Sequence, residues 1–160
     1  MNILVSQCLL GEPCRYDGQS KPVLELEQLR RAGHVLIPAC PEVLGGLSTP
    51  RPPAELQADG RVVNREGTDV TAQYELGARR SLVLAEAHGC RYAVLKAKSP
   101  SCGSQMIYDG TFSGTLIPGQ GVAAQLLAQA GIQVVEEGQI EALLSALSDP
   151  HKNPSKAVKR

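Results

Sequence analysis

Three cysteines of this sequence each stand just after a short apolar segment, inside a loop that contains glycine or proline. They are Cys8, Cys40 and Cys102. The apolar segments are typical of buried strands, and α/β proteins build their sites where the carboxyl ends of such strands meet. If the three strands are parallel neighbours, the three thiols converge. Three scattered thiolates suit an iron–sulfur cluster with one open iron, and the alternative is three ordinary buried cysteines.

The other two cysteines have different surroundings. Cys14 lies six residues after Cys8 and could supply a fourth ligand or a thiol beside the ligands. Cys90 follows a glycine that ends a predicted helix, and the role we expect for it is that of a small buried apolar side chain. Four thiolates would suit structural zinc, but zinc usually takes paired Cys-x2-Cys motifs, which this sequence lacks.

Polar residues in the same loops could do acid–base or binding chemistry. Glu42 stands two residues after Cys40 and could act as a general acid or base, or be an exposed or capping carboxylate. Ser99 and Ser101 flank Pro100 and could donate hydrogen bonds to a substrate or to cluster sulfurs, or only cap the turn. The basic and phenolic residues that could contact a polar ring or an anion, or simply lie at the surface, are Arg15, Tyr16, Arg51 and Lys98.

The elements that must position these residues follow from periodicity and capping signals. Short apolar runs predict strands over 2–6, 34–37, 92–97 and 133–135. Helical spacing predicts helices over 20–33, 68–88, 121–130 and 139–147. Ser20 and Thr68 are the expected N-caps, and Gly33 and Gly89 are the expected ends of the first two helices. This order predicts a single α/β, three-layer sandwich with a mainly parallel sheet.

Three further segments lie outside that framework. Residues 55–64 contain Asp59-Gly60, a strong turn signal, and predict a small β-hairpin. Residues 42–53 and 113–119 show no periodicity, and we expect loops there. A structureless stretch as long as 42–53 is usually functional or mobile in a compact domain.

Composition limits the classes of function. With 160 residues, 42% of them hydrophobic, the chain predicts one domain over 1–148 and a basic, flexible tail over 149–160. The formal net charge is zero, and there is no tryptophan and only one phenylalanine, so neither charge nor aromatic stacking favours nucleic acid as a partner. Five cysteines are an odd number, and neither a secretion signal nor an apolar run of about 18 residues is present, so we expect a cytoplasmic protein with reduced thiols and no membrane segment.

Three blocks of the sequence together resemble a known family. They are Ser6-Gln-Cys8-Leu-Leu-Gly11 with Cys14-Arg-Tyr-Asp-Gly18, Cys40-Pro-Glu-Val-Leu-Gly-Gly-Leu47 with Thr49-Pro-Arg51, and Leu95-Lys-Ala-Lys-Ser-Pro-Ser-Cys-Gly103 with Ile107-Tyr-Asp-Gly-Thr-Phe112. These blocks are similar to those of the thiouracil desulfidase-like family, small bacterial proteins formerly labelled a domain of unknown function. The resemblance extends to about residue 147 and leaves the basic tail outside.

The resemblance implies a 4Fe–4S cluster bound by three cysteines, which map onto Cys8, Cys40 and Cys102. It implies a non-redox reaction in which water replaces the sulfur of a thiouracil-like base, with Glu42 handling protons and Ser99 positioning the substrate or relaying a proton. The expected partner is a small-molecule thiolated base. Two alternatives remain open at this point, a non-catalytic iron–sulfur carrier or sensor and a zinc-stabilised binding domain.

Overall fold

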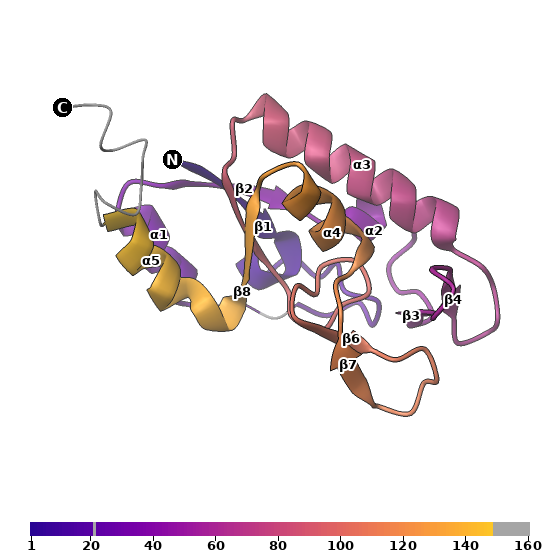
Figure 1. The fold of residues 1–160 in the computed structure, drawn as a ribbon. Coiled ribbons are helices and arrows are strands. Elements are labelled where there is room, and N and C mark those ends of the chain that lie inside the picture. Colours follow the sequence, from indigo (N-terminus) through magenta and orange to yellow (C-terminus); the bar gives the residue numbers. More distant parts are fainter. Residues whose placement is uncertain (21, 149–160) are drawn as a thin grey trace.

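A sheet of four parallel strands forms the centre of the computed structural model, which describes residues 1–20 and 22–148 (Figure 1). The strand order is β2–β1–β5–β8. The strands are β1 (Asn2–Ser6), β2 (Val35–Ala39), β5 (Tyr92–Leu95) and β8 (Gln133–Glu136). The predicted parallel sheet is therefore confirmed, and the segment at 149–160 that was expected to be a tail lies outside the described residues.

Helices cover both faces of the sheet, as the predicted three-layer sandwich requires (Figure 1). They are α1 (Leu26–Arg31), α3 (Thr71–Ala87), α4 (Val122–Gln129) and α5 (Ile140–Ser148). Side chains alternate along a strand, so Ile3 and Val5 of β1 contact the layer of α1 and α5, whereas Leu4 contacts the layer of α3 and α4. All three side chains are fully buried, which is why this strand reads as a continuous apolar run.

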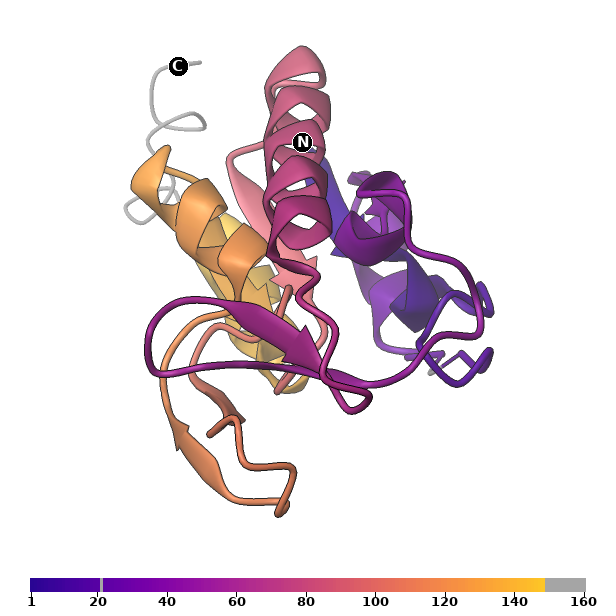
Figure 2. The same cartoon turned by 90° about the vertical axis from the view of Figure 1, so that its right-hand side faces the viewer.

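Two small antiparallel hairpins lie at one end of the molecule (Figure 2). They are formed by β3 (Ala54–Leu56) with β4 (Val62–Asn64) and by β6 (Met106–Tyr108) with β7 (Leu116–Pro118). The first is the predicted hairpin at Asp59-Gly60. The prediction of a loop is wrong over 116–118, because a three-residue strand is too short to show alternation. The buried carboxylate of Glu55 accepts the N–H groups of Gly110 and Phe112 at 3.0 and 3.1 Å and so joins the two hairpins.

The first helix begins later than its predicted cap. α1 starts at Leu26, so Ser20 is not its N-cap and that prediction is wrong. Pro22 has no N–H to give, and the N–H of Val23 donates to the Leu9 carbonyl at 3.0 Å. The backbone before α1 is thus tied to the loop after β1 rather than to a helical turn.

The long helix also begins after its predicted cap. α3 starts at Thr71, and the N–H of Thr68 donates to the side chain of Asn64 at 2.9 Å instead of entering a helix. The carboxylate of Asp69 accepts the N–H of Thr71 at 2.9 Å. The predicted end is confirmed, because Gly89 has φ +63° directly after the last turn.

Short helical turns follow three of the central strands. They are η1 (Gln7–Leu10) after β1, α2 (Pro41–Leu44) after β2 and η2 (Glu137–Gln139) after β8. Residues 42–44 of α2 fall in the stretch predicted as structureless, and a helix of four residues is too short to show a helical period. In the part of the chain that the structure describes, no helix is both long and apolar enough to span a membrane.

Candidate active site

Three cysteine-bearing loops meet because β1 lies between β2 and β5. Ser6 pairs in register with Ala39 of β2, and Val5 pairs with Val94 of β5, so the three strands finish at the same edge. Cys8 lies in η1 after β1, Cys40 directly follows β2, and Cys102 lies in the loop after β5. All three line one cavity with a volume of about 520 Å³, which extends toward the two hairpins. The convergence that the sequence predicts is therefore present.

The loop of Cys102 is held by the first turn of α4. The N–H groups of Val122 and Ala123 donate to the carbonyls of Pro100 and Ser101, each at 2.9 Å. The contact is so close that a Cβ on Gly121 would lie 2.5 Å from the carbonyl carbon of Ser101. The free N–H groups at a helix start thus fix the backbone that positions the Cys102 thiol.

The short helix α2, which follows Cys40, rests directly on the backbone of α3. A Cβ on Gly77 of α3 would lie 1.8 Å from the Pro41 carbonyl oxygen, and one on Gly45 would lie 1.9 Å from the carbonyl oxygen of Gln73. Only glycine at both positions allows the two backbones to approach this closely. This contact places Glu42, in the first turn of α2, over the cavity.

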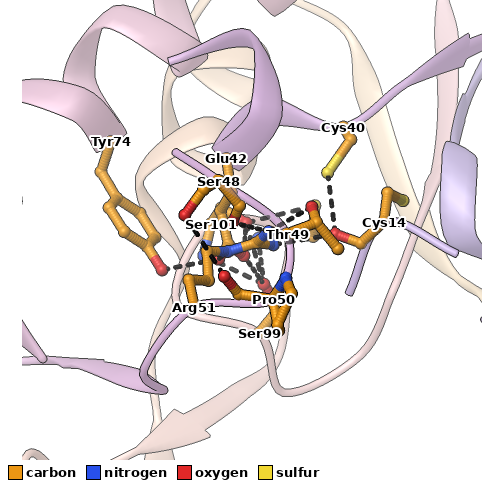
Figure 3. A network of polar contacts seen from close by, with 11 residues as sticks. Cys14, Cys40, Glu42, Ser48, Thr49, Pro50, Arg51, Tyr74, Ser99 and Ser101 are labelled. Carbon is orange, nitrogen blue, oxygen red and sulfur yellow. Dashed lines mark hydrogen bonds and ion pairs between the residues drawn. The ribbon is translucent and has the colours of Figure 1, made fainter. Parts of the chain in front are cut away.

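The Glu42 carboxylate lies at the centre of a polar network (Figure 3). Its Oε1 accepts the hydroxyl of Tyr74 at 2.8 Å and the Nε–H of Arg51 at 3.1 Å. Its Oε2 accepts the hydroxyl of Ser101 at 2.9 Å, with the Ser99 hydroxyl at 3.5 Å. The two serine hydroxyls are 2.9 Å apart, so they form a chain of exchangeable protons beside the carboxylate.

Ser99 also has the structural role that the sequence left open. Its Oγ accepts the N–H groups of Ser101 and Cys102 at 3.1 and 3.2 Å, which caps the turn. The same oxygen lies in the cavity wall beside Glu42. Turn-capping and substrate contact are therefore compatible at this residue.

The thiols are buried, and their pKa values reflect this. Burial raises the pKa of Cys102 to about 12, although the hydroxyls of Ser6 and Ser101, each 3.5 Å from its Sγ, oppose the rise. A hydrogen bond with Cys14, together with burial, raises the pKa of Cys40. A neighbouring cation would be needed to hold these groups as thiolates, and metal ligation supplies one.

Cys14 and Cys90 have different surroundings in the structure. Cys14 lines the cavity, and the Cys40 Sγ lies 3.8 Å from its carbonyl oxygen. The contact with Cys40 lowers the pKa of Cys14, but contact with Cys8 and burial outweigh that effect and raise the pKa of Cys14 to about 11. Cys90 does not line the cavity and is buried in the apolar layer beneath α3 and α4, as the sequence suggests.

The remaining predicted contact residues also line the cavity. Arg15 forms an ion pair with Asp17 at 3.6 Å, and Tyr16 is partly exposed. Lys98 lines the cavity with a φ of +69°, an uncommon conformation for a residue with a side chain. Arg51 also lines the cavity, and four of its N–H groups bond to the protein, one to Glu42 and three to other acceptors.

Two residues of the site have no clear signal in the sequence. Tyr74 stands at helical spacing on α3 and reads as a core residue, yet its hydroxyl reaches Glu42. Ser6 ends β1, where its Oγ accepts the N–H of Lys96 at 2.9 Å and contacts the sulfur of Cys102. A polar residue at the end of an apolar strand is a weak hint for Ser6, and nothing local distinguishes Tyr74.

The thiol donors and the size of the cavity suit an iron–sulfur cluster. Cysteine thiolates are the usual ligands of such clusters. Cys8, Cys40 and Cys102 line a cavity with a volume of about 520 Å³, which leaves room for a thiolate-bound cluster together with a small ring. Among residues 1–20 and 22–148, no three histidine, cysteine or acidic side chains are grouped so that they could hold one metal ion.

A family model described as 2-thiouracil desulfurase matches residues 3–139. The chain belongs to this family. YbbK of Bacillus subtilis strain 168, described as an uncharacterized protein, is 44% identical over 154 residues, with 89% of this chain and 99% of that protein covered. A solved structure described as the 4Fe-4S-dependent thiouracil desulfidase TudS is 50% identical, with a TM-score of 0.86 and coverage of 92% of this chain and 97% of that chain. The family resemblance read from the three sequence blocks is confirmed.

Proposed function

We propose that this protein removes sulfur from thiouracil-like bases, with a 4Fe–4S cluster bound through Cys8, Cys40 and Cys102. Family membership and the description of the related solved structure support this assignment. One observation on this chain supports the proposal most directly: three strand-end thiols, Glu42 and two serine hydroxyls line one cavity. In the overall reaction the thiocarbonyl sulfur leaves as sulfide and water supplies the oxygen, so no electrons are exchanged.

A cluster bound by these three thiolates would leave one iron without a protein ligand, and that iron would act as a soft Lewis acid toward the thiocarbonyl sulfur. The protein's own residues handle protons and position the substrate. Glu42, whose carboxylate accepts the hydroxyls of Tyr74 and Ser101 and the Nε–H of Arg51, serves as the base toward the attacking water. Ser99 orients the substrate or passes a proton to Ser101, since the two hydroxyls are in hydrogen-bond contact.

The residues around the cavity match a small polar ring. Arg15, Tyr16 and Ser101 offer donors to the carbonyl and ring nitrogen atoms of a base. The formal charge of the chain is balanced, which gives no long-range attraction for a nucleic acid. A small-molecule thiolated base is therefore the substrate class that we propose.

Anaerobic reconstitution followed by iron and sulfide analysis tests the cofactor, and incubation with 2-thiouracil tests the reaction. We expect about four iron and four sulfide per chain, and release of equal amounts of sulfide and uracil. Cys102→Ala should lose the cluster, whereas Cys90→Ala, a matched change outside the cavity, should keep it. A loaded protein that releases no sulfide would contradict the reaction and favour a carrier or sensor. Full iron content in Cys102→Ala would contradict the ligand assignment.

A further inference from the structure

Tyr74 of α3 and Arg51, which follows α2, both donate to one oxygen of the Glu42 carboxylate (Figure 3). We infer that these two side chains act as positioning residues, forming a clamp on Oε1 of Glu42 that reserves Oε2 for proton exchange through Ser101 and Ser99. The role of the clamp in turnover rests on the proposed function. The clamp itself is a property of the folded chain.

Tyr74 reaches the Glu42 carboxylate from α3, the helix on which α2 rests. It lies in the first turn of α3, is only 2% exposed, and is packed with Val62 and Val70. Its ring is therefore fixed by apolar contacts, and its hydroxyl points at Glu42 Oε1 at 2.8 Å. A buried hydroxyl needs a partner, and this carboxylate is the partner that the fold provides.

Arg51 holds the same oxygen and cannot easily leave it. Its Nε–H donates to Oε1 at 3.1 Å, and the side chain is only 6% exposed. Its other groups donate to the carbonyl of Cys14 at 3.0 Å, and to the carbonyl of Ser48 and the hydroxyl of Thr49, each at 3.1 Å. Rotating the guanidinium would break contacts to three chain segments at once, so its charge stays beside Oε1.

The two oxygens of Glu42 thus have different partners. Oε1 accepts two donors whose positions are fixed by packing and by further hydrogen bonds. Oε2 accepts the hydroxyl of Ser101 at 2.9 Å and lies 3.5 Å from that of Ser99, and both hydroxyls can rotate. Oε1 is therefore held by fixed donors, and Oε2 is the oxygen that contacts the mobile hydroxyls.

Tyr74→Phe tests the clamp, with Tyr92→Phe as the matched control. Both tyrosines are buried, but Tyr92 lies on β5 in the layer of α1 and α5, away from the cavity. In cluster-loaded Tyr74→Phe we expect kcat with 2-thiouracil to fall about tenfold, with KM changed by less than about twofold and iron content unchanged. Tyr92→Phe should keep the kcat of the wild type. An unchanged kcat in Tyr74→Phe, or loss of iron together with activity, overturns the positioning role.

Urea unfolding of the apo-protein gives a readout that does not depend on turnover. We compare the midpoints for Tyr74→Phe, Glu42→Gln and the double variant. If the hydroxyl binds the carboxylate, the shift in the double variant differs from the sum of the single shifts. Additive shifts overturn the clamp even in an active enzyme. Failure of the wild type to release sulfide contradicts the proposed reaction instead, and coupled shifts would then still show the clamp.

Discussion

For Gly77→Ala, helix propensity and the tertiary contact with α2 predict opposite changes in stability. Gly77 lies inside α3, and helix propensity alone predicts that alanine there would stabilise the protein by about 1 kcal/mol. The tertiary contact predicts the opposite. The added Cβ would lie 1.8 Å from the carbonyl oxygen of Pro41 and 2.7 Å from its carbonyl carbon. Both are backbone atoms, so no side-chain rotation can relieve the overlap.

The size of the effect follows from that overlap. α2 and α3 would have to separate by more than about 1 Å to restore an ordinary contact distance. Overpacking of this kind costs roughly 1–3 kcal/mol, and a contact between two backbones belongs at the upper end. After subtracting the gain in helix propensity, we expect a net loss of about 2 kcal/mol, or roughly 4–8 °C in the Tm of the apo-protein.

The displacement of α2 should also disturb the candidate active site, because α2 begins directly after Cys40 and contains Glu42. Thermal unfolding of the apo-protein and iron content after reconstitution measure the two effects separately. Gly138→Ala is the control, since its Cβ would meet nothing within 4 Å, and both quantities should stay at wild-type values. A Gly77→Ala protein that melts at or above the wild-type temperature and binds a full complement of iron would refute the reasoning.

Three further predictions follow from the same contacts. Cys14→Ala should keep about four iron per chain, because three thiolates suffice for a cluster with an open iron, and loss of one quarter or more of the iron would instead indicate a fourth ligand. Gly121→Ala should lower iron content while circular dichroism stays unchanged, since its Cβ would displace the loop of Cys102; normal loading would contradict this. Leu127→Ala, at a fully buried position between the sheet and α4, should reduce the free energy of unfolding by roughly 2–5 kcal/mol in urea titration, and a smaller loss would show that the cavity collapses.

Local signals predicted most of the fold correctly. The middle of β1, residues 3–5, and all of β5 are runs of buried apolar residues, and Asp59-Gly60 forms the expected turn between β3 and β4. The errors lie where local preference competes with distant partners. Ser20 has the right type for a helix cap, but the chain after it bonds to the loop of β1, so α1 starts later. β7 and α2 have three and four residues, too few to show a period.

Some residues of the candidate site could likewise be predicted from the sequence, and others could not. Cys8, Cys40 and Cys102 could be found because each follows a strand, and parallel strands finish at a common edge. Tyr74 could not be found, because a tyrosine at helical spacing looks like any core residue until the partner of its hydroxyl is known. The sequence also could not show that Arg51 bonds to Glu42 and to the carbonyl of Cys14.

The sequence by itself determined the elements, the loops that hold the thiols, and the family to which the chain belongs, because apolar alternation, turn residues and contiguous motifs are local properties. The tertiary structure decided that β1 lies between β2 and β5, and that α2 touches α3 through Gly45 and Gly77. It also decided which oxygen of Glu42 is clamped. These features depend on contacts between residues far apart in the chain, which only the folded backbone brings within hydrogen-bonding and van der Waals distance.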